Sequence, residues 1–190
     1  MSSGTVERIL DETGGRAGQG VPMKLYLAGP LGFSEAGRDF YYRVLIPGLE
    51  RAGHAVLDPW KLIDPEKIDA VLSLPSGPAR RDAWRVLNRE IGRNNHAALD
   101  ACDAVLAVLD GVDVDSGTAA EIGYAFARGK PIVGYRGDLR LAADNEALTV
   151  NLQVEYFILA SGGDIVTTVG AIAGALAALD PGDGSGTVSV

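Results

Sequence analysis

The run AVLAVL at residues 104–109 constrains the fold more than any other stretch of this sequence. It is short, continuously apolar and bounded by Asp103 and Asp110, a pattern typical of a strand that is buried on both faces. Strands of this kind occur in parallel sheets whose two faces are covered by helices. The chain is therefore expected to fold as an α/β protein around this strand.

The rest of the chain alternates between strand-like and helix-like stretches, which supports the same fold class. Pro47 is expected to kink its helix or to mark the last turns. Residues 58–78 contain four prolines and are interpreted as a long loop, with or without a short helix. Further strands are expected at residues 24–28, 54–57 and 131–135, and helices at 34–52, 79–101, 116–128, within 145–159 and, after a short strand or turn, within 165–179.

The two ends of the chain differ in composition from its middle. Residues 1–22 and 180–190 are rich in glycine and serine, which favours a disordered N-terminal extension and a flexible tail. Residues 23–179 then make up a single domain, which is large enough to bury a substantial core.

Charge and cysteine content argue against several classes of protein. The chain has 17 basic and 25 acidic residues, and a net charge of −8 repels the phosphate backbone of nucleic acids. Cys102 is the only cysteine, so neither an internal disulfide nor a cysteine-based metal cluster can form. No apolar run reaches the roughly 18 residues of a membrane span, and no signal-peptide core is present. We therefore expect a cytoplasmic enzyme with no metal site and no nucleic-acid or membrane partner.

Two junctions between a strand and the following helix carry the most reactive side chains. Ligands of open α/β sheets bind where strands end, so residues 26–33 and 110–121 should open onto the same edge. The second junction contains Asp115 and Glu121, with Glu121 expected on the first turn of its helix. Thr118 and Glu121 also match a capping box, which would give the carboxylate a structural role. The nearby Asp115 and the strand-end location favour instead the carboxylates that sugar transfer requires.

An amide falls within the apolar stripe of the helix expected at 79–101. Asn95 lies between Ile91 and Ala98 in this stripe, and an inward amide must find hydrogen-bond partners. A tie to a loop backbone and a contact with a ligand are both open, and Asn94 is the neighbouring candidate. The other members of the stripe are Trp84, Leu87 and Cys102.

These motifs occur in the order found in one enzyme family. The sequence resembles the nucleoside 2-deoxyribosyltransferase family over residues 23–160, and the block from Asp115 to Glu121 is the most specific part. The resemblance implies a flavodoxin-like, Rossmann-type parallel sheet with helices on both faces. It also implies a homo-oligomer whose active sites are completed by a neighbouring subunit. The matching motifs are YLAGP at 26–30, Asn94-Asn95 before Asp103, DSGTAAEIGYA at 115–125 and Asn151-Leu152.

The resemblance further implies roles for individual residues. Glu121 matches the nucleophile, Asp115 the ligand of a sugar hydroxyl, and Tyr26 the tyrosine beside the nucleophile. Asn151 matches the asparagine that the neighbouring subunit contributes to the sugar. The remaining candidates for substrate binding are Asp58 and Trp60, which fall in the segment that lines the base pocket, together with Gly29, Phe33, Ser116 and Gly117.

The implied reaction moves a 2-deoxyribosyl group from a deoxynucleoside to a free nucleobase through a covalent intermediate on Glu121. A deoxynucleoside lacks the electron-withdrawing 2′-hydroxyl, so its C–N bond breaks relatively easily, and neither a metal nor an organic cofactor is needed. Water as the acceptor would make the enzyme a hydrolase. Many members of the family carry an aspartate that helps to protonate the leaving base. This chain has Asn95 there, which leaves Asp58 or solvent to supply the proton.

Two other interpretations remain open. One is a deoxynucleoside 5′-monophosphate N-glycosidase with the same nucleophile, which would need phosphate-binding donors near the first junction. That junction offers Gly29, Ser34 and Arg38 but also Glu35, and the balance favours the free nucleoside. The second is a non-catalytic module that senses nucleosides or nucleotides on the same fold. The presence of both Asp115 and Glu121 speaks against a sensor.

Overall fold

The computed structural model describes residues 21–141 and 143–179 and contains a five-stranded parallel sheet in the order β2-β1-β3-β4-β5. This is the flavodoxin-like order, so the predicted fold class is confirmed. The extensions predicted at 1–22 and 180–190 lie outside the described residues, except for Val21 and Pro22, which are exposed. The strands are β1 (Lys24–Ala28), β2 (Ala55–Leu57), β3 (Ala104–Val108), β4 (Ile132–Tyr135) and β5 (Ile165–Val166).

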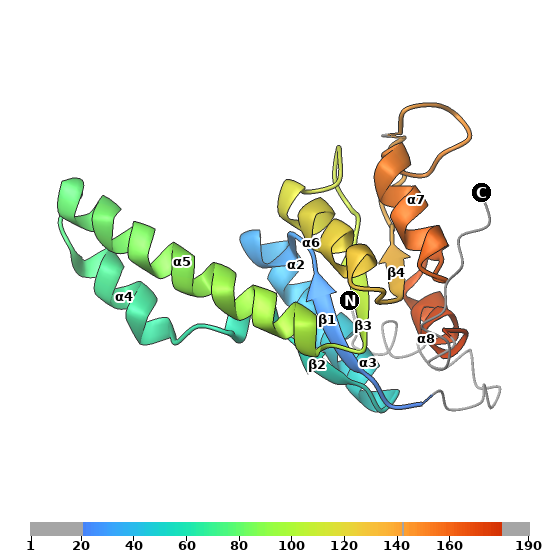
Figure 1. The fold of residues 1–190 in the computed structure, drawn as a ribbon, viewed down its shortest axis with the longest axis horizontal. Coiled ribbons are helices and arrows are strands. Elements are labelled where there is room, and N and C mark those ends of the chain that lie inside the picture. Colours follow the sequence, from blue (N-terminus) through green and yellow to red (C-terminus); the bar gives the residue numbers. More distant parts are fainter. Residues whose placement is uncertain (1–20, 142, 180–190) are drawn as a thin grey trace, which may run out of the picture.

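The central strand β3 is buried along its whole length, as its sequence predicts. It lies between β1 and β4, with Tyr26 beside Val105 and Ile132 on the other side of Val105. Helices cover both faces of the sheet (Figure 1). One face packs against α2 (Glu35–Phe40), α3 (Ile46–Arg51) and α8 (Val169–Ala177), and the other against the end of α5 (Pro78–Ala101), α6 (Ser116–Ala127) and α7 (Leu152–Ala160).

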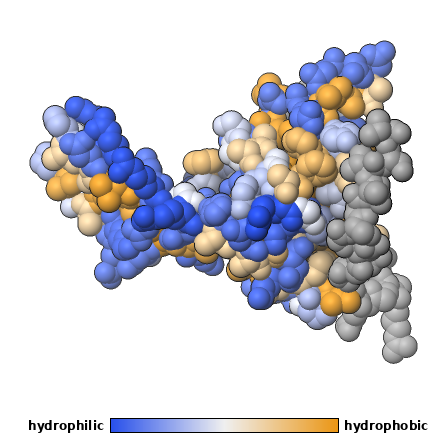
Figure 2. All heavy atoms as spheres, in the orientation of Figure 1, coloured by the Kyte–Doolittle hydropathy of each residue, from blue (hydrophilic) through white to orange (hydrophobic). Residues whose placement is uncertain are grey.

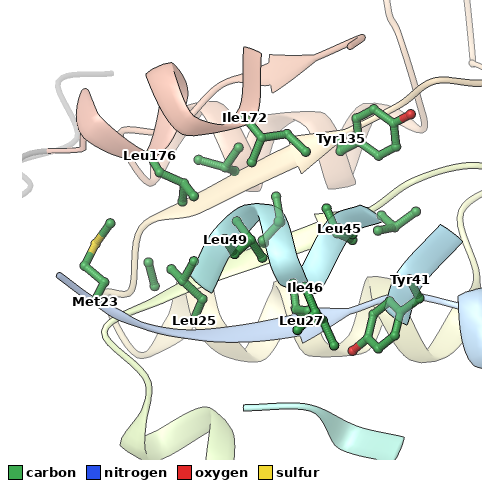
Figure 3. Close-up of a cluster of buried hydrophobic side chains, with 14 of the residues drawn as sticks. Met23, Leu25, Leu27, Tyr41, Leu45, Ile46, Leu49, Tyr135, Ile172 and Leu176 are labelled. Atoms are coloured by element: carbon green, nitrogen blue, oxygen red, sulfur yellow. The ribbon is translucent and has the colours of Figure 1, made fainter. Parts of the chain in front are cut away.

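The first of these faces contains the cluster drawn in Figure 3. Leu25 and Leu27 of β1 meet side chains of the helical segment before β2 and of α8 on this face. The residues on the opposite face of β1, Tyr26 and Ala28, belong to the second cluster. The alternation of a strand therefore turns Tyr26 away from the first cluster and toward α6, where the site forms.

The helix expected at 34–52 is interrupted. It begins as α2, with the Ser34 hydroxyl accepting the Gly37 N–H as its N-cap. It then widens into a π-helical turn, η2 (Tyr41–Leu45), before continuing as α3. Pro47 stands at the start of α3, and its missing N–H and its bulky ring explain why the regular hydrogen bonding breaks there. Of the two roles expected for Pro47, the structure shows the second, since Pro47 marks the last turns of the helical segment.

The short helix allowed for within residues 58–78 is present, but more of this segment is helical than a long loop implies. The segment contains a 3₁₀ helix, η3 (Pro59–Lys61), and a nine-residue helix, α4 (Pro65–Ser73). Asp58 and Asp64 are the N-caps of these helices, and a proline follows each of them at the first helical position. Proline is favoured there because the first N–H of a helix needs no partner within the helix. The prolines thus start helices here.

Helices α4 and α5 form an arm that extends away from the sheet (Figure 1). The space-filling view shows this arm standing clear of the body, with a mainly hydrophilic surface interrupted by a hydrophobic patch (Figure 2). Only the C-terminal part of α5 reaches the core, where Ala98 and Leu99 are buried against the sheet. The α4–α5 arm matters for function because one side of α5 forms a wall of the pocket described next.

Candidate functional site

A pocket of about 550 Å³ lies beside the carboxyl ends of β1 and β3. Three parts of the chain enclose it: the segments that follow β1 and β2, one side of α5, and the start of α6. Its lining residues are Gly29, Phe33, Pro59, Trp60, Trp84, Asn88, Ile91, Asn95, Asp115, Gly117, Thr118 and Glu121. The two junctions singled out in the sequence do therefore meet at one edge of the sheet.

Glu121 of the pocket lining is paired with Tyr26, which is fully buried and is not itself a lining residue. The Tyr26 hydroxyl donates to Oε1 of Glu121 over 2.6 Å, across the interface between β1 and α6. Burial raises the pKa of the Glu121 carboxyl, the Tyr26 hydroxyl lowers it, and the charge of Asp115 raises it again. Burial and the Glu121 charge also raise the pKa of Tyr26 well above its usual range, so the tyrosine keeps its proton.

The capping-box alternative for Glu121 is wrong. The N-cap of α6 is Asp115, whose Oδ2 accepts the Thr118 N–H over 3.0 Å and the Thr118 hydroxyl over 3.3 Å. Glu121 is the sixth residue of α6, so it lies on the second turn and not on the first as expected. Its carboxyl faces Tyr26 and not the free N–H groups at the start of the helix. A structural role as a cap therefore belongs to Asp115.

Capping occupies only one of the two carboxylate oxygens of Asp115. Among the hydrogen bonds of the described residues, those of Asp115 side-chain atoms involve Oδ2 alone. Gly117 lines the pocket, and a Cβ at this position would lie 3.0 Å from Oδ2, so a glycine leaves room for the cap. Ser116 is exposed at the first position of α6 and is not among the lining residues.

Trp60 forms an aromatic wall at the mouth of the pocket. Its ring packs onto the backbone of Gly32, where a Cβ would lie 2.1 Å from Cε2 of Trp60, so only a glycine fits. The exposed ring of Phe33 meets Trp60 edge-to-face, with 4.7 Å between the ring centroids. Gly29 lines the same end, and a Cβ there would meet the Val108 side chain at 2.9 Å.

Asp58 supports this wall from behind. It is buried, and its carboxylate accepts hydrogen bonds from the Trp60 N–H and from the hydroxyls of Tyr41 and Tyr42, at 3.0 to 3.1 Å. The residues that line the pocket include Trp60 but not Asp58. The expectation that Asp58 lines the base pocket is therefore wrong, because its carboxylate is turned inward and held by three donors. Its place in the structure is that of a positioning residue for Trp60.

The wall formed by α5 contains residues that sequence reasoning missed as site residues. Trp84, Asn88, Ile91 and Asn95 follow one another at spacings of four, three and four, so they share one side of the helix. The sequence pattern predicts Trp84 and Ile91 as core residues. In the structure they lie in the part of α5 that extends away from the sheet. The second amide, Asn88, seven residues before Asn95, was the signal that could have identified this stripe as a pocket wall.

The two neighbouring asparagines of α5 differ in their surroundings. Asn94 donates from Nδ2 to the Leu62 carbonyl over 2.7 Å and so ties α5 to the segment after η3. Asn95 lines the pocket, and its Oδ1 is buried without a hydrogen-bond partner among the described residues. The sequence left open whether an inward amide is tied to a loop backbone or contacts a ligand. The tie to a loop backbone is made by Asn94.

Asn151 lies apart from this pocket in the same chain. It is the N-cap of α7, and its Oδ1 accepts from the N–H groups of Gln153 and Val154. Its Nδ2 contributes only a long contact of 3.4 Å to Asp144. Capping therefore uses the oxygen of the amide, while the nitrogen remains a donor that a further group could reach.

The pocket is acidic. Its charged lining residues are Asp115 and Glu121, and the cations Arg38 and Lys61 lie elsewhere, with Arg38 donating to the Gly32 carbonyl and Lys61 placed over the Tyr42 ring. Within residues 21–141 and 143–179, no group of three or more His, Cys, Asp or Glu side chains is arranged to hold a metal ion. None of the helices in this part of the chain is long and apolar enough to cross a membrane.

Comparisons with known proteins place the chain in a family and support its fold. The model of the family described as nucleoside 2-deoxyribosyltransferase matches residues 25–153. No match was found among curated proteins. Similar solved structures include a conserved protein from Enterococcus faecalis V583, with 23% identity, a TM-score of 0.57 and coverage of 82% of this chain and 98% of that chain.

Two further solved structures are 2-deoxyribosyltransferases. The enzyme from Bacillus psychrosaccharolyticus has 20% identity and a TM-score of 0.55, and the match covers 79% of this chain and 90% of that chain. The enzyme from Leishmania mexicana has 25% identity and a TM-score of 0.52, and the match covers 82% of this chain and 95% of that chain.

Proposed function

The chain belongs to the nucleoside 2-deoxyribosyltransferase family, and from this premise we propose that it transfers a 2-deoxyribosyl group between nucleobases through a covalent intermediate on Glu121. Hydrolysis is the outcome when water replaces the second base. The observation that carries the proposal is the partly buried carboxyl of Glu121, held by the Tyr26 hydroxyl at 2.6 Å inside a pocket with aromatic walls.

Glu121 is suited to act as the nucleophile. Its partly buried carboxylate is less solvated than one in water, so less water must be displaced when it attacks C1′ of the sugar. The Tyr26 hydrogen bond occupies Oε1 and fixes the rotamer, which leaves Oε2 for attack. In the first step a C1′–O bond to Glu121 forms while the C1′–N bond breaks, and its electron pair leaves with the base.

The second step reverses these changes. A ring nitrogen of the incoming base attacks C1′, the C1′–O bond breaks, and the Glu121 carboxylate is regenerated. Two displacements on opposite faces return the original configuration at C1′. The departing base gains one proton and the incoming base loses one, so the exchange is balanced in protons.

Solvent is proposed as the source of the proton for the departing base. Besides the nucleophile, the charged group of the pocket lining is Asp115, and the Asp58 carboxylate is already held by three donors. An amide such as Asn95 can hold a base by hydrogen bonds but cannot deliver a proton. The free oxygen of Asp115, Oδ1, is proposed to accept a hydrogen bond from a sugar hydroxyl.

A free nucleoside fits the pocket better than its 5′-monophosphate. The lining residues carry two carboxylates and, within the described part of the chain, no lysine, arginine or histidine. A phosphate would be repelled by these carboxylates without a compensating cation. The acidic pocket thus favours a deoxynucleoside as the donor substrate.

The first prediction tests the function directly. Incubation with 2′-deoxyadenosine and a second free base should give the new deoxynucleoside, measured by chromatography, whereas adenosine should react at least about tenfold more slowly, because its 2′-hydroxyl makes the C–N bond harder to break. 2′-Deoxyadenosine 5′-monophosphate should also react more slowly than the nucleoside. Equal kcat/KM for the deoxy and ribo substrates would contradict the proposal, and a preference for the monophosphate would favour the N-glycosidase.

The second prediction concerns Tyr26→Phe. Its hydroxyl lowers the Glu121 pKa, so its removal should raise that pKa further and move the acid limb of the kcat/KM profile to higher pH. The nucleophile must be ionised, so activity is lost as pH falls through this pKa. We expect roughly a tenfold loss at neutral pH. An unchanged acid limb in a folded variant would show that Tyr26 does not tune the nucleophile.

A homo-oligomer with shared sites is proposed as well. The outward side of α7 presents Leu152, Tyr156 and Leu159, which are 52%, 46% and 49% exposed and lie at spacings of four and three. Such a stripe is typical of a helix face that packs against a partner. Asn151 precedes this stripe directly, and its Nδ2 would reach a neighbouring pocket if two copies met along α7.

A further inference from the structure

We propose that the pocket selects nucleobases that carry an exocyclic amine, adenine and cytosine, over the corresponding oxo bases, and that Oδ1 of Asn95 is the atom that makes the selection. The inference rests on the proposed function, since it names the class of base that the same site accepts. It does not depend on the identity of the nucleophile, so it can be tested by binding alone.

Asn95 is the starting observation. In the part of the chain that the structure describes, Oδ1 of Asn95 is the one buried side-chain nitrogen or oxygen atom without a hydrogen-bond partner. Buried polar atoms are almost always paired, and an exception calls for a cause. Asn95 belongs to the pocket lining, so a donor carried by the pocket's occupant is a partner that the fold itself does not supply.

The adjacent Asn94 shows that the local backbone does not force an asparagine side chain to remain unpaired. Asn94 has the same side chain and finds the Leu62 carbonyl over 2.7 Å. The amide of Asn94 thus serves the fold, whereas Asn95 belongs to the pocket lining and its Oδ1 has no partner among the described residues. The stripe of Trp84, Asn88 and Ile91 on the same side of α5 places Asn95 at its inner end, nearest the core.

The chemistry of the unpaired atom determines which bases fit. Oδ1 is an acceptor, so an amine on the base satisfies it, whereas a carbonyl oxygen at the same place sets two acceptors against each other. The side-chain amide also matches adenine as a pair, because Oδ1 accepts from N6 while Nδ2 donates to N7. Rotating the amide by half a turn would bury its NH₂ group instead, and unpaired buried N–H groups are rarer than unpaired carbonyls.

The size of the effect follows from the hydrogen bond that only one class of base can make. An amino base pairs with an acceptor that is buried and unpaired in the free protein, whereas an oxo base gains no such bond and places a second acceptor against it, a difference in Kd of about tenfold or more. The aromatic rings of the pocket stack on any flat base and therefore add affinity without separating amino from oxo bases. Discrimination between the two classes is thus assigned to Asn95.

The test uses the protein's own tryptophans. The chain contains two, Trp60 and Trp84, and both line the pocket, so intrinsic fluorescence reports directly on its occupant. Titration with free adenine and hypoxanthine, and with cytosine and uracil, should give a Kd at least about tenfold lower for the amino base of each pair. Equal Kd values within each pair, as expected if a bridging water satisfies Oδ1, would overturn the inference.

Three variants separate the acceptor from other roles of the residue. Asn95→Leu removes the acceptor at similar volume and should abolish the preference. Asn95→Asp offers only acceptor oxygens when its carboxyl is ionised, so at such a pH it should retain the preference. Asn94→Ala is the matched control and should keep the wild-type ratio, since Asn94 bonds to Leu62. If Asn95→Leu does not fold, the comparison of wild type with Asn95→Asp still decides. Loss of the preference in Asn95→Asp, at a pH at which the introduced carboxyl is ionised, would contradict the proposal.

Kinetics connects the inference to the reaction. The kcat/KM for 2′-deoxyadenosine should exceed that for 2′-deoxyinosine by a similar factor, and Asn95→Leu should bring the two together. If adenine binds more tightly than hypoxanthine but no deoxynucleoside reacts, the selectivity stands and the proposed transfer is wrong. If both deoxynucleosides react equally well, the transfer stands and the selectivity is wrong.

Discussion

Glu121→Gln is expected to abolish deoxyribosyl transfer and, at neutral pH, to make the folded protein more stable. The amide is neutral and cannot attack C1′, so kcat should fall roughly 10⁴-fold or more, as for other nucleophiles that have been removed from enzymes. The side-chain oxygen of the glutamine can still accept a hydrogen bond from the Tyr26 hydroxyl, so the local structure is expected to persist. Activity and stability should therefore change in opposite directions.

The stability change has a sign that depends on pH. Burial raises the pKa of Glu121 in the folded state above its value in the unfolded chain. A carboxyl of this kind favours the folded state below its unfolded pKa and loses that contribution as pH rises through the folded value. Thermal unfolding of wild type and Glu121→Gln should thus differ most near pH 7, with the higher Tm for the variant, and least near pH 4.

Asp115→Ala is the informative contrast. It removes a carboxylate from the same pocket but also the N-cap of α6, so it should lose both activity and about 0.5 to 2 kcal/mol of stability. Near-normal turnover in folded Glu121→Gln would rule out the nucleophile. If the Tm of Glu121→Gln fell equally near pH 7 and near pH 4, burial would not destabilise the ionised carboxyl of Glu121.

Mixing two inactive variants is expected to restore activity if neighbouring subunits share each site. One partner is Glu121→Ala, and the other is Asn151→Asp. The aspartate keeps an oxygen for the N-cap of α7 and removes the amide donor, so the proposed sugar contact is lost. Because its charge would lie beside the Asp144 carboxylate, the folding of the variant is checked by circular dichroism. In a hybrid dimer, one of the two sites combines the intact Glu121 of one chain with the intact Asn151 of the other.

The expected recovery is substantial. Random exchange of equal amounts of two dimers makes half of the molecules hybrids with one working site of two, or roughly a quarter of wild-type activity. Transfer activity should be measured after exchange has been demonstrated with differently tagged chains. No recovery under those conditions, or full activity in a diluted monomer, would exclude a shared site.

The sheet and the edge that holds the candidate site could be predicted from sequence because both depend on local patterns. The apolar run that became β3 could not face water on either side, so it had to be a central strand. Tyr26, Asp115 and Glu121 follow or belong to strands and helix starts whose ends meet in any parallel sheet. Their convergence needed only the topology and no knowledge of side-chain packing.

The α5 wall and residues 58–78 could not be predicted in the same way. Proline marks a loop or the first position of a helix, and the choice depends on the preceding cap, which Asp58 and Asp64 provide. The periodic stripe of Trp84 and Ile91 indicates that one side of a helix is covered, but it does not indicate what covers that side. Whether a protein core or a ligand covers it depends on how far α5 runs past the sheet, which is a tertiary property.

The α4–α5 arm divides the site into two parts with different attachments (Figure 1). Tyr26, Asp115 and Glu121 are fixed to the edge of the sheet, whereas the amides and Trp84 are carried by a helix anchored to the core only at its C-terminal end. Substitutions in the arm, including some far from the pocket, can therefore change its tilt and the width of the pocket without disturbing the proposed reacting groups. If the proposed function holds, selection for new bases can act on one helix while the chemistry stays constant.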